Sequence, residues 1–335
     1  MKTKRFASLL VLAPLALLAG CSSASTFGLS ANWFSNVSST NIPSDFEETL
    51  EYAVSYERSA SSLSGKFVVD YSDGTYSVKL EDGAVDGQKT YVYTTELRMN
   101  VQYSLNGGAP KEFQDVVKTR VEFLDTANEL KPLRSTREVH GTVPLTTPSA
   151  PNATLNECYM KTDYVVDITY NHDAQKAIFN LTYYTKEGTK DNTKNNIEDK
   201  SIKIKCKGLF FDNEQLIPML RAAELSSSMA IYTIDPTTRS LEKLSVKDGP
   251  TAVTLTQSVQ FDADAETVEP TTFKANEISI AYGKPNSGGT HTFTLAQRWA
   301  PDSNKYRNVC LKYSYPVINS HGTLTYTLTK ANFYR

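Results

Sequence analysis

Histidine and cysteine are the first residues to consider for catalysis or metal binding, and the sequence holds four of each. None of the histidines has a partner at the spacing of a metal site; they are His140, His172, His291 and His321. A Gly-x-Ser-x-Gly elbow and a glycine-rich phosphate loop between a strand and a helix are also missing. We therefore expect a non-catalytic protein that uses no metal and no cofactor.

Three cysteines other than Cys21 lie far apart in the sequence: Cys158, Cys206 and Cys310. Because their number is odd, at most one disulfide can join them. In an exported chain the most plausible pair is Cys158 with Cys206, and the alternative is three buried free thiols. The sequence leaves both open.

A short acidic series could in principle bind calcium through Asp262, Asp264 and Glu266. Its set of oxygen ligands is incomplete for a recognised calcium loop. We therefore favour a solvated acidic loop.

Tyrosine is abundant, with 19 residues. It is common in strands because its ring packs well on a pleated surface, so packing alone explains much of this pattern. If the rings point into a concave face, they form an amphipathic lining suited to a lipid, glycan or peptide. The candidate groove-lining residues are Tyr91, Tyr93, Tyr164, Tyr183 and Tyr313.

The elements that would position these tyrosines are strands, since apolar and polar residues alternate along much of the chain. We expect hairpin breaks at 72–74, 82–83 and 106–108 in the first series, and a turn at 171–173 in the second. Strands as long as 90–103 favour a wide, curved sheet. The first two series of predicted strands cover 51–57, 66–70, 75–80, 90–103, 113–124, 133–143, 164–170, 177–185 and 201–207.

The period changes to that of a helix over 212–225, where Leu216, Met219, Leu220 and Ala223 share one face. Asp212 and Gln215 can form a capping box, and Pro218 in the second turn predicts an irregular start. Arg221 on this helix is expected to form a structural salt bridge. Strands then resume over 230–234, 240–246, 251–261, 275–282, 290–300, 309–315 and 324–328.

The predicted fold class is mainly β: a large, strongly curved antiparallel sheet or half-open barrel with one inserted helix. It forms a single domain over 46–335, with an N-terminal half at 46–208, the helix at 212–225 and a C-terminal half at 229–335.

The N-terminus reads as a signal peptide, with Lys2, Lys4 and Arg5 before an apolar run too short to span a bilayer. The residues Leu18-Ala19-Gly20-Cys21 that follow resemble the lipobox of bacterial lipoproteins. The resemblance implies cleavage after residue 20 and acylation of Cys21, whose chains anchor the protein to a membrane. A polar segment over 21–45 is expected to be a flexible tether.

Cleavage before Cys21 removes three basic residues and no acidic one, which takes the formal net charge from −2 to −5. Basic residues do not cluster along the chain, and this argues against binding to nucleic acid.

Three further stretches resemble, in order, an uncharacterised family of bacterial envelope proteins with a strongly curved antiparallel sheet. They are Phe123–Asp125 with Leu130–Ser135, Phe211–Asn213 leading to Arg221, and Trp299–Asp302. The fold of that family is similar to the half-barrels of the lipoprotein carriers, which hold acyl chains in a concave face. The family has no activity to transfer, so it assigns no functional residue.

Together these observations predict a lipid-anchored cell-envelope protein on the extracytoplasmic side, with a binding or scaffolding role. The leading hypothesis is an apolar or acylated ligand in the concave sheet. The alternatives are a protein-interaction surface and a glycan-binding surface.

Overall fold

The computed structural model describes residues 47–60, 66–126, 129–145, 152–185, 189–191, 200–206, 208–222, 230–236, 238–261, 267–282, 289–297 and 309–334. The expected signal peptide, Cys21, the tether, the acidic series at 262–266 and Trp299 lie outside these residues. So does most of the polar loop between residues 186 and 200.

A 15-stranded sheet dominates the described chain, and it confirms the predicted fold class. Its first arm consists of β1 Glu47–Arg58, β2 Phe67–Val85, β3 Gln88–Leu105, β4 Lys111–Thr126, β5 Glu129–Pro144, β6 Tyr159–Asn171, β7 Lys176–Tyr183 and β8 Lys200–Lys203. Its second arm consists of β9 Leu209–Phe210, β10 Ala230–Asp235, β11 Ser240–Ser258, β12 Pro270–Tyr282, β13 Thr290–Ala296, β14 Cys310–Pro316 and β15 Gly322–Tyr334.

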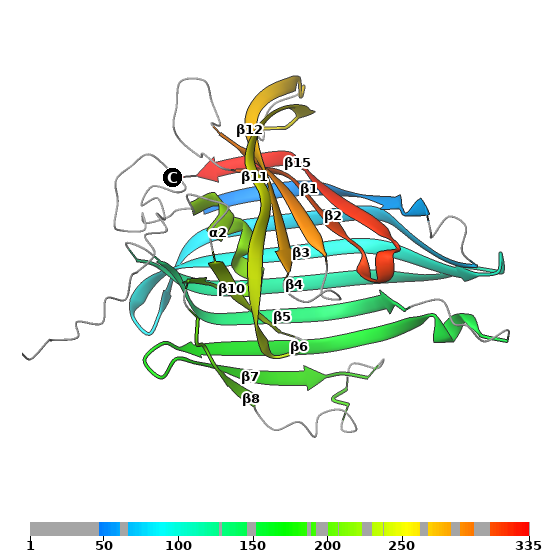
Figure 1. Cartoon of the computed structure of the whole chain (residues 1–335), viewed down its shortest axis with the longest axis horizontal. Helices are drawn as coiled ribbons and strands as arrows, with labels where there is room; N and C mark the ends of the chain where they lie inside the picture. Colours follow the sequence, from blue (N-terminus) through cyan, green and yellow to red (C-terminus); the bar gives the residue numbers. More distant parts are fainter. Residues whose placement is uncertain are drawn as a thin grey trace, which may run out of the picture.

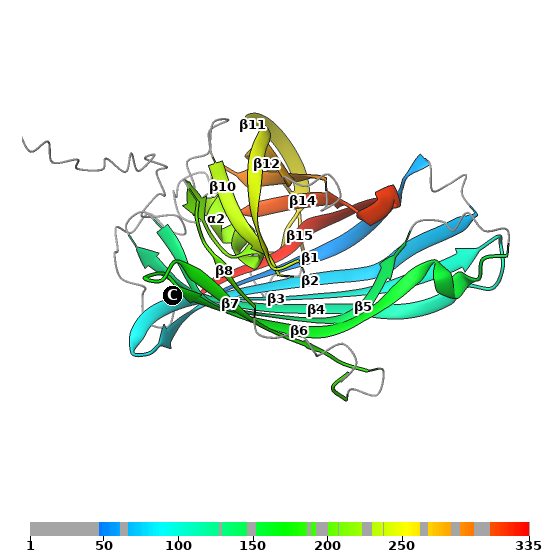
Figure 2. The ribbon, with the colours of Figure 1, turned by 60° about the horizontal axis from the view of Figure 1, so that its bottom comes forward.

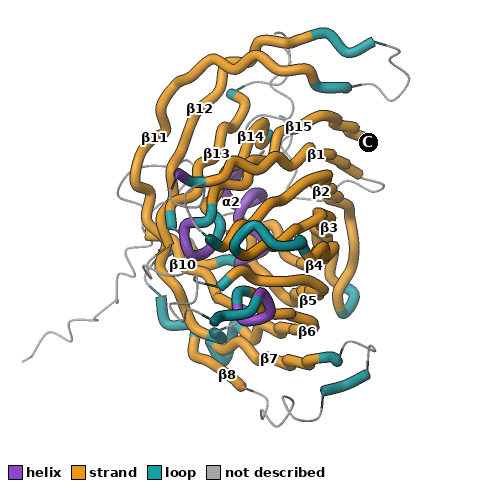
Figure 3. The backbone as a smooth tube through the Cα atoms, turned by 90° about the vertical axis from the view of Figure 1, so that its right-hand side faces the viewer, coloured by secondary structure: helices purple, strands orange, loops and turns teal. Residues whose placement is uncertain are grey.

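The two arms join where β1 pairs with β15, and β8 and β9 are the two ends of the strand order. The sheet is strongly curled, with β10, β11 and β12 passing across the first arm (Figure 1). Turned by 60°, the second arm stands above the first (Figure 2). Viewed from the end, the strands form a C that encloses the helix α2, Leu216–Ala222 (Figure 3).

Burial alternates along most strands, so that one face of the sheet is mostly apolar and is covered where the sheet curls. In β1, for example, Leu50, Tyr52 and Val54 are buried while Glu51 and Ala53 between them are exposed. The largest apolar cluster combines residues of both arms, among them Leu50, Tyr93 and Val121 of the first and Leu311 and Leu328 of the second. The core therefore lies inside the C.

Two predicted hairpin breaks in the first arm are wrong. Residues 72–74 form a β-bulge inside the continuous strand β2, with Asp73 at φ +50°. A Cβ on Gly74 would lie 2.6 Å from Cβ of Val54, so glycine there allows β1 to approach closely. Residues 82–83 also continue the strand, and the turn follows at Asp86-Gly87, both with positive φ.

The predicted turns at 106–108 and 171–173 are confirmed as chain reversals between β3 and β4 and between β6 and β7. The predicted separation of 240–246 from 251–261 is wrong. Residues 240–246 and 251–258 lie in one strand, β11, which continues through bulges between Val246 and Thr251. Glycine and proline at 249–250 mark an irregularity inside a long strand.

The predicted helix is confirmed over Leu216–Ala222, and residues 223–225 of the predicted range lie outside the described residues. A 3₁₀ turn, η2 Asn213–Gln215, precedes α2, and the irregular start expected from Pro218 is this turn. The capping box is present: Asp212 accepts a hydrogen bond from N–H of Glu214, and Gln215 accepts one from N–H of Asp212. The helix connects β9 to β10, a parallel pair that interrupts the otherwise antiparallel sheet.

Side chains of the η2 turn hold the second arm against the first. Asp212 contacts the Tyr170 hydroxyl on β6, Glu214 pairs with Arg137 on β5 at 2.6 Å, and Gln215 donates to the Leu130 carbonyl at 3.0 Å. A second set of contacts joins the arms at the C-terminal end of β5. There the side chains of Asn319 and His321 form hydrogen bonds with the carbonyl groups of Pro144 and Leu145.

Arg221 of α2 forms a salt bridge with Glu48 of β1, as expected from the sequence. Their side chains are only 4% and 3% exposed. A buried ion pair costs desolvation free energy, and removal of one partner leaves an uncompensated charge.

We predict that Arg221→Met lowers the free energy of unfolding by about 3–5 kcal/mol, because Glu48 is then left buried without its partner. The double variant Glu48→Leu/Arg221→Met should recover much of this loss. Urea denaturation checks both. As a control, Arg120→Met removes a surface pair with Glu122 and should cost less than about 1 kcal/mol. Equal losses for Arg221→Met and Arg120→Met would contradict this account.

Candidate functional site

The concave side of the sheet, which we call the inner face, is the side that carries Leu50, Val78, Tyr93, Val121, Phe293 and Leu328. It is built from strands of both arms, and α2 lies inside the C that these strands form (Figure 3). A ligand in contact with the inner face would therefore touch residues that are far apart in the sequence.

Stacked aromatic side chains run across the inner face on β13, β14 and β15. The Phe293 and Tyr313 rings are 4.6 Å apart and nearly parallel, and Tyr313 lies 5.2 Å from Tyr326. Tyr315 lies 5.4 Å from the imidazole of His291. The row continues to the first arm through Tyr76, whose ring meets that of Tyr326 edge to face at 5.1 Å.

Several tyrosine residues of the inner face keep some accessible surface although they lie inside the C. Tyr71, Tyr76, Tyr282, Tyr313 and Tyr315 are partly exposed, whereas the neighbouring rings of Tyr52, Tyr93 and Tyr326 are at most 3% exposed. The aromatic inner face is therefore less completely buried at these residues than at its centre.

The hydroxyl groups of these tyrosines mostly bond to protein. The Tyr313 hydroxyl lies 3.0 Å from Nδ1 of His291, and those of Tyr315 and Tyr326 are 3.2 Å apart. Burial raises the pKa of Tyr76, Tyr313 and Tyr315, so the hydroxyls remain uncharged at neutral pH. The surface offered to a ligand is thus mainly neutral and aromatic.

The five tyrosines predicted from the sequence fall into two groups. Tyr91, Tyr93 and Tyr164 are 1%, 2% and 8% exposed, and they pack within the core with almost no surface left for a ligand. Tyr183 and Tyr313 are partly exposed on the inner face. Contact of these rings with a ligand stays a prediction.

Arg137 adds a charged group to the inner face. Its guanidinium donates to Oε1 of Glu214, and its side chain remains 26% exposed. Tyr164 also lies beside it, and the positive charge of Arg137 partly offsets the effect of burial, which raises the pKa of that tyrosine. The pair is electrically neutral, so Arg137 does not make the inner face basic.

Asp115 of β4 is a buried acid on the same face, only 9% exposed. Its Oδ1 accepts hydrogen bonds from N–H of Thr142 at 2.9 Å and from the Thr142 hydroxyl at 3.0 Å. The Thr142 hydroxyl also lies 2.9 Å from that of Tyr103. Burial raises the pKa of Asp115 to about 6, although the hydrogen bonds from Thr142 act in the opposite direction.

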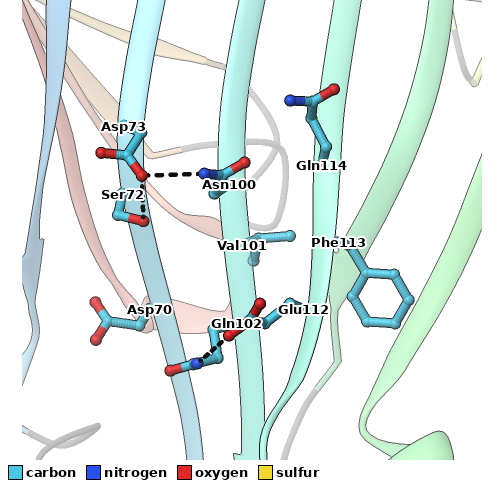
Figure 4. A pocket seen from close by; sticks show the side chains of 9 residues that line it. All are labelled: Asp70, Ser72, Asp73, Asn100, Val101, Gln102, Glu112, Phe113 and Gln114. Atoms are coloured by element: carbon cyan, nitrogen blue, oxygen red, sulfur yellow. Dashed lines mark hydrogen bonds between the residues drawn. The ribbon is translucent and has the colours of Figure 1, made fainter.

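A polar pocket of about 520 Å³ lies along β2, β3 and β4 (Figure 4). Two cross-strand rows supply its polar groups, Asp70–Gln102–Glu112 and Ser72–Asn100–Gln114. Its amides already bond to its acids, Asn100 to Asp73 and Gln102 to Glu112, each at 3.0 Å. Such groups suit a hydroxyl-rich ligand, and the glycan-binding alternative stays a prediction.

Cys158 and Cys310 are buried free thiols, so Cys158 is not bonded to Cys206. Burial raises the pKa of Cys310 to about 12, which keeps this thiol protonated. Within the described ranges, no three His, Cys, Asp or Glu side chains are arranged to hold a metal ion. In the same part of the chain, no helix has the length and apolar character needed to cross a bilayer.

Sequence reasoning missed Asp115, Arg137, Tyr71, Tyr76 and Tyr282. A signal existed for Asp115, because it lies between Phe113 and Val117 on the apolar side of the alternating pattern of β4. No signal in one sequence brings Tyr76 of β2 to Tyr326 of β15.

Comparison with known proteins finds a similarity to a solved structure. No protein-family profile matches the chain, and no curated protein matches it. A crystal structure of a beta-barrel-like protein of the domain of unknown function DUF1849 from Brucella abortus is similar to 88% of this chain and 100% of that chain. The sequence identity is 10% and the TM-score is 0.43.

We predict that Asp115→Asn flattens the dependence of the unfolding free energy on pH. The folded wild type holds this proton up to about pH 6 and the unfolded chain only to about pH 4, so the wild type loses stability as pH rises between these values. The loss relative to Asp115→Asn should reach at most about 3 kcal/mol. Urea denaturation at pH 4 and pH 7 measures it, and parallel changes for both proteins would show that Asp115 is not the cause.

Proposed function

We propose that this protein is a lipid-anchored component of the cell envelope, held on the extracytoplasmic side through Cys21, that binds an apolar or acylated ligand on its inner face. The observation that carries the binding function is the partly exposed aromatic row inside a curled sheet. A tightly packed core would bury these rings as completely as it buries Tyr93 and Tyr326.

The chemistry of the inner face favours a ligand that is largely apolar. Phenol rings with internally paired hydroxyls offer apolar and aromatic contact area, and contact with a ligand would remove this area from water. The partly exposed aliphatic side chains of Leu97 and Val117 extend the apolar surface along the first arm. An acyl chain suits such a surface, because it needs no hydrogen-bond partner along its length.

The lipid anchor rests on the N-terminal sequence alone. A basic start, a short apolar run and Leu18-Ala19-Gly20-Cys21 together favour acylation of Cys21 over ordinary secretion. An anchored binding protein can act on ligands that enter or leave a membrane, and a polar tether over 21–45 would give it reach.

Adjacent residues on opposite faces of β4 provide a matched test of the binding surface. Val117 lies on the inner face and Val116 on the outer face, and both are partly exposed. We predict that Val117→Trp weakens binding of the uncharged fluorescent probe N-phenyl-1-naphthylamine at least about tenfold, because the indole occupies ligand space. Val116→Trp should bind as the wild type does.

Probe fluorescence titrated with each purified protein measures this difference. Equal binding by both variants, or no binding by the wild type, would contradict the proposed binding surface. Circular dichroism checks that both variants keep their strand content.

The anchor has its own test in the host cell. We predict that an alkyne-bearing palmitate analogue labels the wild-type protein and does not label Cys21→Ala, because acylation requires this thiol. Fractionation should then find the variant released from the membrane. Labelling of Cys21→Ala, or an unlabelled wild type, would refute the anchor.

A further inference from the structure

Asp115 lies on the inner face with part of its hydrogen-bonding capacity unused. Within the described part of the chain, both hydrogen bonds to this carboxylate end on Oδ1, and both come from Thr142. A carboxylate has two oxygens that can accept hydrogen bonds, so Oδ2 remains able to accept from a ligand. Around this group lie the tyrosines Tyr71, Tyr103 and Tyr315, one from each of β2, β3 and β14.

Asp115 forms no salt bridge with any described residue, and its hydrogen-bond partner is the neutral Thr142. The ammonium group of Lys161 on β6 lies over the Phe113 ring, 5.0 Å from its centroid. Two arginines lie in the interior, and each already forms a salt bridge: Arg137 with Glu214 and Arg221 with Glu48. The donors that face Asp115 from β5 are neutral groups of Thr142, and the tyrosines around it are neutral as well. At neutral pH the polar end of the inner face is therefore negatively charged.

We propose that the inner face selects ligands whose polar end is an uncharged or cationic hydrogen-bond donor that Asp115 accepts, and that it rejects ligands ending in a carboxylate or phosphate. Hydroxyl, amide N–H and ammonium groups belong to the first class. This inference rests on the proposed function, because it names the chemical class of ligand for the same surface.

Discrimination against an anion follows from burial. Two negative charges repel more strongly when protein replaces the water around them, and Asp115 has no salt bridge among the described residues to offset the loss of hydration. A donor group on the ligand instead forms a charge-assisted hydrogen bond with the free carboxylate oxygen. Ligands with the same acyl chain should therefore differ in affinity through their polar ends alone.

The test compares dodecanol, dodecylamine and dodecanoate at pH 7.5, each displacing N-phenyl-1-naphthylamine from the full-length purified protein. We expect dodecanol and dodecylamine to bind at least about tenfold more tightly than dodecanoate. In Asp115→Asn the affinity for dodecanoate should rise about tenfold and that for dodecylamine should fall. Asp167→Asn is the matched control: this exposed acid of β6 also accepts a threonine hydroxyl, that of Thr136, and its removal should leave the order unchanged.

The possible outcomes separate the two proposals. If neither the probe nor any dodecyl ligand binds, the proposed function fails and this inference fails with it. If the ligands bind but dodecanoate binds as tightly as dodecanol, or tighter, only the inference is overturned. The order measured with the wild type decides this even if Asp115→Asn does not fold.

Discussion

The η2 turn is the constraint on which the rest of this structure depends. The sheet is open, since β8 and β9 are its two ends, so backbone hydrogen bonds do not close the curl. Side chains hold the arms together instead, through Asp212 with Tyr170 and Glu214 with Arg137. The capping box that begins the helix fixes the direction of these side chains. Without this turn, the two arms would lose the polar contacts that join them through Tyr170 and Arg137.

The inner face is rich in tyrosine, although it forms much of the core between the two arms. A sheet of this width must bury one face, and leucine or phenylalanine would fill such a core without leaving polar atoms. Tyrosines occupy much of it instead, and their hydroxyls form pairs such as Tyr315 with Tyr326. Polar tips and partly exposed residues are features of a surface that meets another molecule, and we therefore propose ligand binding on the inner face and not at the exposed polar pocket.

Much of the fold could be predicted from alternation, because one apolar face per strand leaves a period of two in the sequence. Residues 72–74 form a bulge and not the predicted turn, since a single sequence does not distinguish the two. The helix was predictable from its period and capping residues. The candidate site was harder to predict from the sequence. Tyr91 and Tyr93 were correctly placed in a strand, but their burial depends on the second arm. Contacts such as that of Tyr76 with Tyr326 depend on packing between segments distant in sequence.

Native mass spectrometry of the protein purified from its own membrane tests the central claim most directly. The account predicts a bound molecule in near-equimolar amount, released on unfolding, with an apolar chain and a polar end that carries no negative charge. A folded protein that shows only the mass of the acylated chain, and takes up no acyl ligand when one is added, would contradict it.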